Sequence, residues 1–279
     1  MLAASMLIFG SVGIFRRNIA LSSGMIAFVR GLLGTVFLCA AARVKGVPLR
    51  GGTDRKTYIL LAVSGGLIGL NWMLLFEAFT YTTVPIATLC YYMQPTIVIL
   101  LSPLLFRERL TGRRLAAAAA ALAGMILISG VFGTGTEGTA GGKGILFGLS
   151  AAVLYAIVVI MNKKLGGVPA YEKTVIQLAF AAAVMIPYLF LTGNMEFTGI
   201  SGKTLVLLLI MGVVHTGLAY VLYFGSIEGV KAQTIAVFSY IDPVSALIFS
   251  ALFLHETLTI QGIAGAVLIL GAAAVSESA

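Results

Sequence analysis

Four ionisable side chains lie within long apolar stretches of this sequence. Asp242 directly precedes Pro243, and His215, Arg30 and Glu77 each lie in a stretch of their own. A charged group in an apolar environment is costly unless it faces protein or a water-filled cavity. Asp242 is therefore the first candidate for chemistry, because a carboxyl group in such a place either exchanges a proton or holds the ammonium group of a bound solute.

Two prolines interrupt the apolar stretches next to polar residues. Pro243 follows Asp242, and Pro95 follows Gln94. A proline inside a helix removes one N–H donor and leaves the carbonyl four residues earlier without its partner. The alternative to a functional role is a pair of structural kinks in which the carboxyl group bonds to a neighbour. We predict two kinked helices that present free carbonyls and polar side chains to a cavity: Tyr91, Gln94 and Pro95 in one, and Ser239, Asp242 and Pro243 in the other.

Aromatic and polar residues in other stretches extend this predicted cavity wall. His215 shares a helix face with Ala219 and Tyr223, although a single histidine on an apolar face also fits a packing role. Aromatic rings suit a flat or amphipathic solute, and they attract a cationic one. The further candidates for the substrate-binding wall are Asn71, Trp72, Tyr92, Tyr155, Tyr220 and Tyr240.

Arg30 and Glu77 are candidates for an ion pair. Arg30 lies about seven residues inside one end of its stretch, and Glu77 lies a few residues inside the same end of the next. At a rise of about 1.5 Å per residue, antiparallel helices place both side chains at a similar depth. We expect them to pair, either as a structural contact or as a gate that breaks and reforms.

The composition identifies the elements that must position these residues. Of the 279 residues, 59% are hydrophobic and only 10% are charged, and the mean hydropathy is +1.06. Soluble domains carry about 25% charged residues, which excludes soluble enzymes, disordered chains, fibrous proteins and disulfide scaffolds. Stretches such as Leu115–Val131 are apolar without alternation, which excludes a transmembrane barrel. The sequence therefore predicts an all-α integral membrane protein.

Ten transmembrane helices of about 20 residues fit the apolar stretches: 1–17, 24–43, 57–79, 83–105, 112–132, 143–163, 173–192, 203–226, 231–253 and 258–276. With the N-terminus in the cytoplasm, most Lys and Arg residues fall in the inner loops, as the positive-inside rule requires. Both termini are then cytoplasmic, in what we expect to be a prokaryotic inner or cell membrane. The formal net charge of +8 thus reflects orientation and predicts no nucleic acid partner.

An internal repeat divides the chain. Residues 76–127 match residues 224–275 without a gap. Two like-folded units of five spans must have opposite orientations in the membrane, and inverted repeats are the usual build of secondary transporters, with a binding site near the midplane. We assign the first five-helix repeat to 1–132, a Gly-rich linker to 133–142 and the second repeat to 143–279.

These features resemble the ten-helix EamA branch of the drug/metabolite transporter superfamily over essentially the whole chain. The resemblance rests on the duplicated five-span unit and on Arg30 early in the second span. It rests also on a proline followed thirteen residues later by Glu-x-Leu, as in Pro95 with Glu108 and Pro243 with Glu256. The resemblance implies export of small metabolites, often amino acids, through a central cavity by alternating access.

Other function classes would require motifs that the sequence does not contain. An intramembrane enzyme would need a serine near His215, but Ser11, Ser150 and Ser239 lie in no nucleophile motif. No His, Cys or carboxylate cluster has metal-ligand spacing, and no Walker-type glycine loop is present. We therefore expect no enzyme, metal or cofactor, and the partners to be a small-molecule substrate and the lipid bilayer. A channel or uniporter, a multidrug efflux carrier, proton coupling, and a monomeric or dimeric state stay open.

Overall fold

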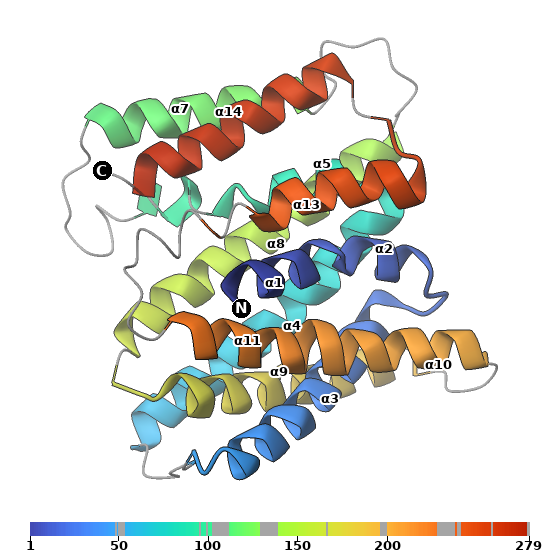
Figure 1. Ribbon diagram of the computed structural model, residues 1–279, viewed down its shortest axis with the longest axis vertical. Coiled ribbons are helices and arrows are strands. Elements are labelled where there is room, and N and C mark those ends of the chain that lie inside the picture. The colour runs from blue at the N-terminus through green and yellow to red at the C-terminus, as the bar shows by residue number, and fades with distance from the viewer. Residues whose placement is uncertain are drawn as a thin grey trace.

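The computed structural model describes residues 1–47, 49, 54–94, 96–98, 100–101, 112–128, 139–165, 167–195, 200–227, 238, 241–257 and 259–277. All regular secondary structure in these residues is helical (Figure 1). The prediction of an all-α membrane protein is confirmed at this level. Within the described residues, five helices are long and apolar enough to cross a membrane: Ser23–Val44, Arg55–Tyr81, Gly141–Asn162, Ala170–Thr192 and Gly202–Tyr223.

The helices occur along the chain in the order of the apolar stretches of the sequence. The earlier part of the chain forms α1 (Leu2–Gly10), α2 (Val12–Arg17), α3 (Ser23–Val44), α4 (Arg55–Tyr81), α5 (Val84–Tyr91) and α7 (Gly112–Ile128). The later part forms α8 (Thr139–Lys164), α9 (Ala170–Thr192), α10 (Gly202–Leu209), the π-helix η1 (Ile210–Leu218), α11 (Ala219–Ile227), α13 (Ile241–Phe249), the π-helix η2 (Ser250–Leu254) and α14 (Ile260–Glu277). Because α8 begins at Thr139, the last residues of the expected linker 133–142 are helical, and the residues before them lie outside the described part.

Polar side chains fix where the long helices begin. The hydroxyl of Ser22 accepts a hydrogen bond from the backbone N–H of Met25 at 3.2 Å before α3. The carboxylate of Asp54 accepts from the backbone N–H groups of Lys56 and Thr57 at 3.1 and 3.3 Å before α4. Ser and Asp at these positions satisfy N–H groups that the first helical turn leaves free. The caps therefore define the polar ends of apolar helices.

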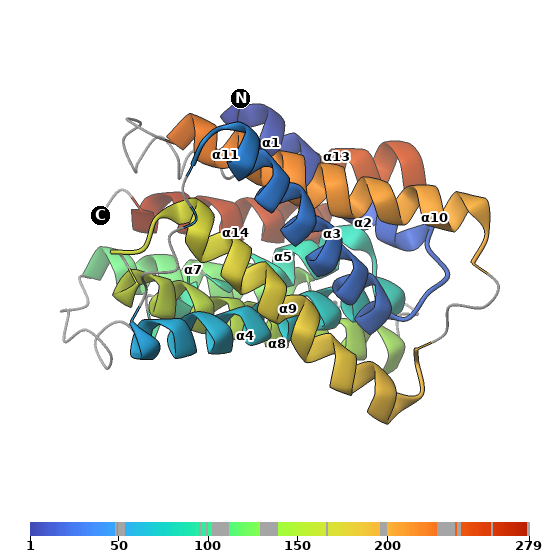
Figure 2. The same ribbon diagram turned by 90° about the horizontal axis from the view of Figure 1, so that it is seen from below.

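The helices pack closely against one another. α7 lies along α14, α4 packs on α8 and α9, and α3 packs on α9 and η1, while α1 contacts both α11 and α13 (Figure 1 and Figure 2). Gly65 and Gly69 of α4 face α9, where an added Cβ would lie 2.5 Å from the carbonyl oxygen of Gln177 or Ala181. Glycine is required there because the two backbones approach each other directly. This small-residue spacing serves packing within the chain.

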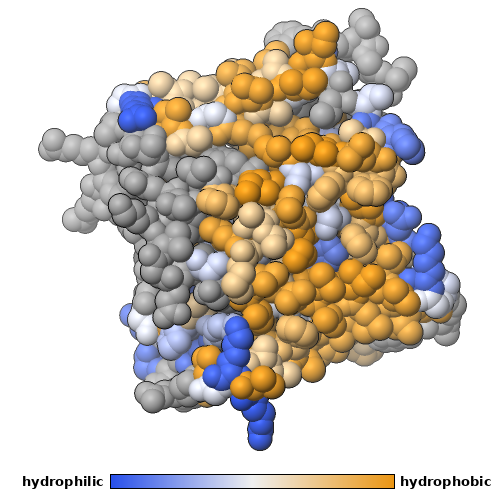
Figure 3. Space-filling view, in the orientation of Figure 1, coloured by the Kyte–Doolittle hydropathy of each residue, from blue (hydrophilic) through white to orange (hydrophobic). Residues whose placement is uncertain are grey.

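The outward faces of the helices are apolar. Figure 3 shows hydrophobic residues over much of one face of the molecule, with hydrophilic residues gathered toward its edges. Soluble monomers rarely expose apolar patches larger than a few hundred Å², whereas lipid is a suitable surrounding for such a surface. The exposed large side chains include Val36, Ile59, Val63, Leu122, Phe190, Leu205 and Val267.

Candidate functional site

A cavity of about 350 Å³ lies among helices from both parts of the chain. Its volume is near the lower end of the range for small-molecule sites, about 300–1,000 Å³. Helices α1, α3, α4 and α5 contribute to its wall, as do α8, α11 and α13. The polar and aromatic lining residues are Phe9, Arg30, Asn71, Trp72, Phe79, Thr88, Tyr91, Tyr92, Gln94, Tyr155, Tyr220, Tyr223 and Asp242.

Most of the residues that the sequence assigned to a cavity wall do meet at this cavity. Ser239, Tyr240 and Pro95 lie outside the described residues, and His215 does not line the cavity. Among the described residues, no group of three His, Cys, Asp or Glu side chains is placed to hold a metal ion. The expected wall residues that line it are Asn71, Trp72, Tyr91, Tyr92, Gln94, Tyr155, Tyr220, Tyr223 and Asp242.

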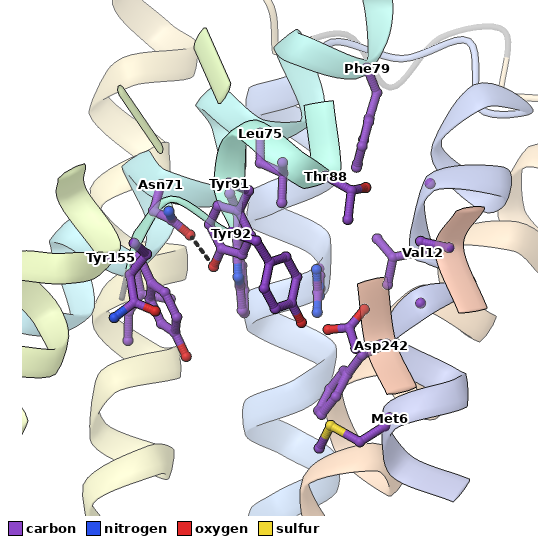
Figure 4. A pocket seen from close by; sticks show the side chains of 18 of the residues that line it. Met6, Val12, Asn71, Leu75, Phe79, Thr88, Tyr91, Tyr92, Tyr155 and Asp242 are labelled. Atoms are coloured by element: carbon purple, nitrogen blue, oxygen red, sulfur yellow. Dashed lines mark hydrogen bonds between the residues drawn. The ribbon is translucent and has the colours of Figure 1, made fainter. Parts of the chain in front are cut away.

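Asp242 lies in the first turn of α13, with its carboxylate beside the ring of Tyr92 in the cavity (Figure 4). The Tyr92 hydroxyl lies close to this carboxylate (Figure 4). A carboxylate in a first turn also interacts favourably with the helix dipole. Pro243 is the next residue of α13.

Tyr91 anchors the aromatic wall of the cavity. Its ring stacks on that of Tyr155, with centroids 5.4 Å apart and planes inclined by 23°. Its hydroxyl donates to Oδ1 of Asn71 at 3.5 Å (Figure 4), and Nδ2 of Asn71 donates to the carbonyl of Ala151 at 2.6 Å. α5 ends at Tyr91, within the stretch predicted as one span. The aromatic wall is thus fixed where a helix is interrupted beside the cavity.

Arg30 and Glu77 have different partners, so the predicted ion pair is wrong. Nε of Arg30 donates to the hydroxyl of Thr216 at 2.7 Å, and its guanidinium carbon lies 4.3 Å from the ring centroid of Trp72. Glu77 accepts a hydrogen bond from Ser23 at 2.5 Å. Ser23 and Arg30 are seven residues apart on α3, which separates the two depths by about 10 Å. Arg30 is therefore deeper in the helix bundle and lines the cavity.

His215 is buried in a contact between η1 and the break that separates α1 from α2. Its Nε2 lies 2.8 Å from the hydroxyl of Ser11, its Nδ1 lies 3.3 Å from the carbonyl of Ile210, and its ring meets that of Phe15 at 4.5 Å. Ser11 also donates to the carbonyl of Ile8 at 2.8 Å. A serine does lie beside His215, but neither residue lines the cavity. The pair joins η1 to the break between α1 and α2.

Sequence reasoning missed several residues near or in this site, among them Phe9, Thr88 and Thr216. Phe9 lines the cavity and meets the ring of Tyr220 edge-on at 5.6 Å. Thr88 lines it from α5. Thr216 holds Arg30 from η1. Thr88 and Thr216 could have been found from the sequence, because each is a polar residue within an apolar stretch, as Asn71 is.

A second polar cluster joins three segments away from the cavity. Arg17 donates to the carbonyl of Thr82 at 2.6 Å and forms an ion pair with Glu256 at 3.0 Å. Glu256 also accepts from the backbone N–H of Val84 at 3.0 Å and from the hydroxyl of Ser250. This Arg17–Glu256 cluster connects the end of α2, the turn between α4 and α5, and the segment after η2.

Comparisons with known proteins agree with this architecture. The chain is 28% identical to the uncharacterized transporter YxxF of Bacillus subtilis, over 92% of this chain and 83% of that protein. It is 27% identical to an uncharacterized transporter of Archaeoglobus fulgidus, over 95% of this chain and 91% of that protein. Protein RarD of Salmonella typhi is 25% identical, over 72% of this chain and 66% of RarD.

Structure and family comparisons cover the whole fold. A protein of known crystal structure has the same fold, with a TM-score of 0.70 at 20% sequence identity, and the match covers 99% of this chain and 96% of the other. The model of the EamA-like transporter family matches residues 1–130 and 142–277. The chain therefore belongs to the EamA-like transporter family and is an integral membrane transporter.

Proposed function

We propose that this transporter is a secondary carrier that exports a small amphipathic metabolite, such as an amino acid, by alternating access. The observation that carries the proposal is the cavity between the two parts of the chain, which combines Asp242, Arg30 and a wall of aromatic rings. Opposite charges and apolar rings together suit a solute with both polar and apolar groups. The volume of about 350 Å³ favours a small metabolite over a large drug.

The pattern of helix contacts supports two related halves. If the spans of the two halves correspond in order, from first to fifth, the main contacts between the halves have counterparts. The α4–α8 contact corresponds to the α1–α11 contact. The α4–α9 contact corresponds to the α3–η1 contact, and the α5–α8 contact corresponds to the α1–α13 contact. The contacts between α3 and α9 and between α7 and α14 join equivalent spans. Such exchange symmetry is expected of repeats that surround a central site.

The Arg17–Glu256 cluster supports the proposed ten-span topology, in which the two halves are inverted. The ten-span topology places the end of α2, the turn between α4 and α5, and the segment after η2 all at the outer side. In the structure Arg17 contacts both Thr82 and Glu256 of the other two segments. Three segments expected on one side therefore share one end of the molecule.

Asp242 has two possible roles in this mechanism. As a proton site it would couple transport to the proton gradient, and as an anchor it would hold the ammonium group of the substrate. The Tyr92 hydroxyl beside it supports either role, because a tyrosine hydroxyl both donates and accepts hydrogen bonds. Asp242→Asn removes the charge and the proton exchange together, so that both roles predict loss of transport.

Counterflow in proteoliposomes tests the proposal. Vesicles loaded with an unlabelled solute are placed in labelled solute, for a panel of amino acids, nucleosides and cationic drugs. A carrier accelerates uptake when substrate is present on both sides, whereas a channel does not. We expect counterflow with at least one amino acid and little with Asp242→Asn.

Glu77→Gln is the matched control, because Glu77 is a carboxylate in the same bundle that does not line the cavity. We expect it to retain transport. If Asp242→Asn kept the wild-type rate and pH dependence, both roles of Asp242 would be excluded. Labelled solute that only equilibrates, without overshoot, would identify a channel in place of a carrier.

A further inference from the structure

Arg30 is a buried guanidinium without an acidic partner among the described residues. Only 5% of the residue is exposed, and no described carboxylate comes within 4.0 Å of its nitrogens. Burying an unpaired charge in this way is costly, and proteins usually place a counter-charge beside it. Asp242 faces the same cavity, but the two side chains form no ion pair. The charge of Arg30 is thus left to act on the contents of the cavity.

The contacts of Arg30 leave one side of its guanidinium group available. Nε donates to the hydroxyl of Thr216 at 2.7 Å. The guanidinium carbon lies over the ring of Trp72 at 4.3 Å and near that of Phe76 at 5.7 Å. No described residue accepts a hydrogen bond from the two terminal nitrogens. Two adjacent N–H groups on a planar guanidinium match the two oxygens of a carboxylate.

The direction of this guanidinium is set by the opposite part of the chain. Thr216 belongs to η1, and its hydroxyl donates to the carbonyl of Met211, five residues earlier, at 3.1 Å. Because this bond uses the only hydroxyl proton, the lone pairs of the oxygen accept from Nε of Arg30. Gly34, on the next turn of α3, leaves room for Thr216, since an added Cβ would lie 2.5 Å from its methyl group. The π-helical turn thus fixes Arg30 over Trp72.

We propose that Arg30 binds the carboxylate of the transported solute and that Thr216 is the positioning residue for this anion site. The inference rests on the proposed carrier function and adds that the substrate has a carboxylate and a cationic group. The carboxylate meets Arg30 on α3, and the cationic group meets Asp242 on α13 and the tyrosine wall. A zwitterion balances both buried charges at once, whereas an amine or a carboxylic acid balances one.

Binding to the purified wild-type protein in detergent tests the carboxylate requirement directly. The probes are L-phenylalanine, L-phenylalaninamide and 3-phenylpropionate, with the matching leucine compounds as a second series. Hydrogen bonds to a charged group contribute enough to change affinity by about tenfold or more. We expect the amino acid to bind at least tenfold more tightly than its amide, as measured by calorimetry. Equal affinity of amino acid and amide, or no binding in either series, would overturn the inference.

Variants then assign the effect to Arg30 and Thr216. Arg30→Gln is expected to weaken the amino acid about tenfold or more and to leave the amide unchanged, so that the preference between them disappears. Thr216→Val is expected to raise KM for the amino acid and reduce the preference, with little change in kcat, and Thr216→Ser is expected to restore both. Thr35→Val is the matched control, because its hydroxyl bonds only within α3, to the carbonyl of Gly31 at 2.7 Å.

The outcomes separate this inference from the carrier proposal. Counterflow of solutes without any dependence on a carboxylate would contradict the anion site and leave the carrier function intact. If no solute shows counterflow but the amino acid still binds through its carboxylate, the anion site stands and the carrier proposal fails. If Arg30→Gln does not fold, two comparisons still test the anion site. One compares the affinities of the wild-type protein for the amino acid and its amide, and the other compares Thr216→Val with Thr216→Ser. An amino acid preference that Thr216→Val does not change would remove the positioning role.

Discussion

Two buried nitrogen-containing side chains, Arg30 and His215, differ in what surrounds them. Arg30 lines the cavity and is held by Thr216, whereas His215 contacts Ser11 and Phe15 outside the cavity. Both were candidates from sequence because both lie in apolar stretches. At the residue scale, therefore, contact with the cavity separates a binding role from a packing role.

For His215 we predict an effect on stability and none on substrate binding. His215→Ala removes the bond to Ser11 and the ring contact with Phe15. Loss of a buried hydrogen bond that leaves its partner unsatisfied costs about 1–3 kcal/mol, so that the melting temperature in detergent should fall. KM in proteoliposomes should stay within about twofold of the wild-type value. A larger change in KM at an unchanged melting temperature would indicate that His215 contributes to substrate binding.

Tyr155 is expected to show the opposite pattern. Its ring stacks on Tyr91 at 5.4 Å in the cavity wall. Aromatic pairs contribute about 0.5–1.5 kcal/mol beyond area burial, so that Tyr155→Ala should raise KM for an aromatic amino acid roughly 2- to 10-fold. Tyr155→Phe keeps the ring and should behave as wild type. If both variants matched the wild type in KM, Tyr155 would not contact the solute.

At the scale of elements, short polar clusters fix the ends of helices and an irregular helix fixes the site. The Arg17–Glu256 cluster joins α2, the turn between α4 and α5, and the segment after η2. η1 turns Thr216 toward Arg30. π-helical turns are rare and often accompany functional sites. Here the turn carries the hydroxyl that accepts the hydrogen bond from Nε of Arg30.

Breaking the Arg17–Glu256 cluster should loosen one end of the transporter. In a variant in which Cys39 and Cys90 are replaced by alanine, Thr82→Cys provides a reporter at this end. We expect Glu256→Gln to increase the rate at which a membrane-impermeant thiol reagent labels that cysteine, because Arg17 and the N–H of Val84 lose their acceptor. The exposed Lys203→Gln is the control. An unchanged labelling rate would mean that the ion pair does not hold this end closed.

The first turn of α4 should respond to acid. Hydrogen bonds from the Thr57 side chain and backbone, followed by that from the Lys56 backbone, lower the pKa of Asp54 below its ordinary value of 3.8. A carboxylate with a lowered pKa stabilises the folded state above the unfolded value, and this contribution is lost as the pH falls through the folded value. We expect amide exchange at Lys56 and Thr57, corrected for intrinsic rates, to rise below about pH 4. Asp54→Asn should abolish the pH dependence.

For the whole molecule, the distribution of charge leads to a prediction about topology. The inner loops of the ten-span arrangement carry most of the 18 Lys and Arg residues, and basic loops stay in the cytoplasm. We expect green fluorescent protein fused to the C-terminus to fluoresce and alkaline phosphatase fused there to be inactive. Active phosphatase at the C-terminus would contradict the predicted orientation.

The class of fold and much of the cavity wall were predictable from the sequence. Lipid offers no hydrogen bonds, so that polar residues such as Asn71, Tyr91 and Asp242 must turn inward wherever the apolar stretches form helices. Their positions along the chain therefore indicated that they would meet in a cavity. Composition alone indicated a membrane protein, because so few charges cannot cover a water-soluble surface, and apolar stretches without alternation indicated helices.

The partners of the buried polar groups were decided by tertiary structure. Residue spacing gives the depth of a side chain in the membrane to within a turn or two, but it does not give the direction in which its helix face points. Arg30 meets Thr216, and His215 meets Ser11, at separations of 186 and 204 residues in the chain. The π-helical register of η1 also has no hydrophobic period that would reveal it. The sequence thus determined which residues leave the lipid, whereas the packing of α3 against η1 decided which of them contact one another and which face the cavity.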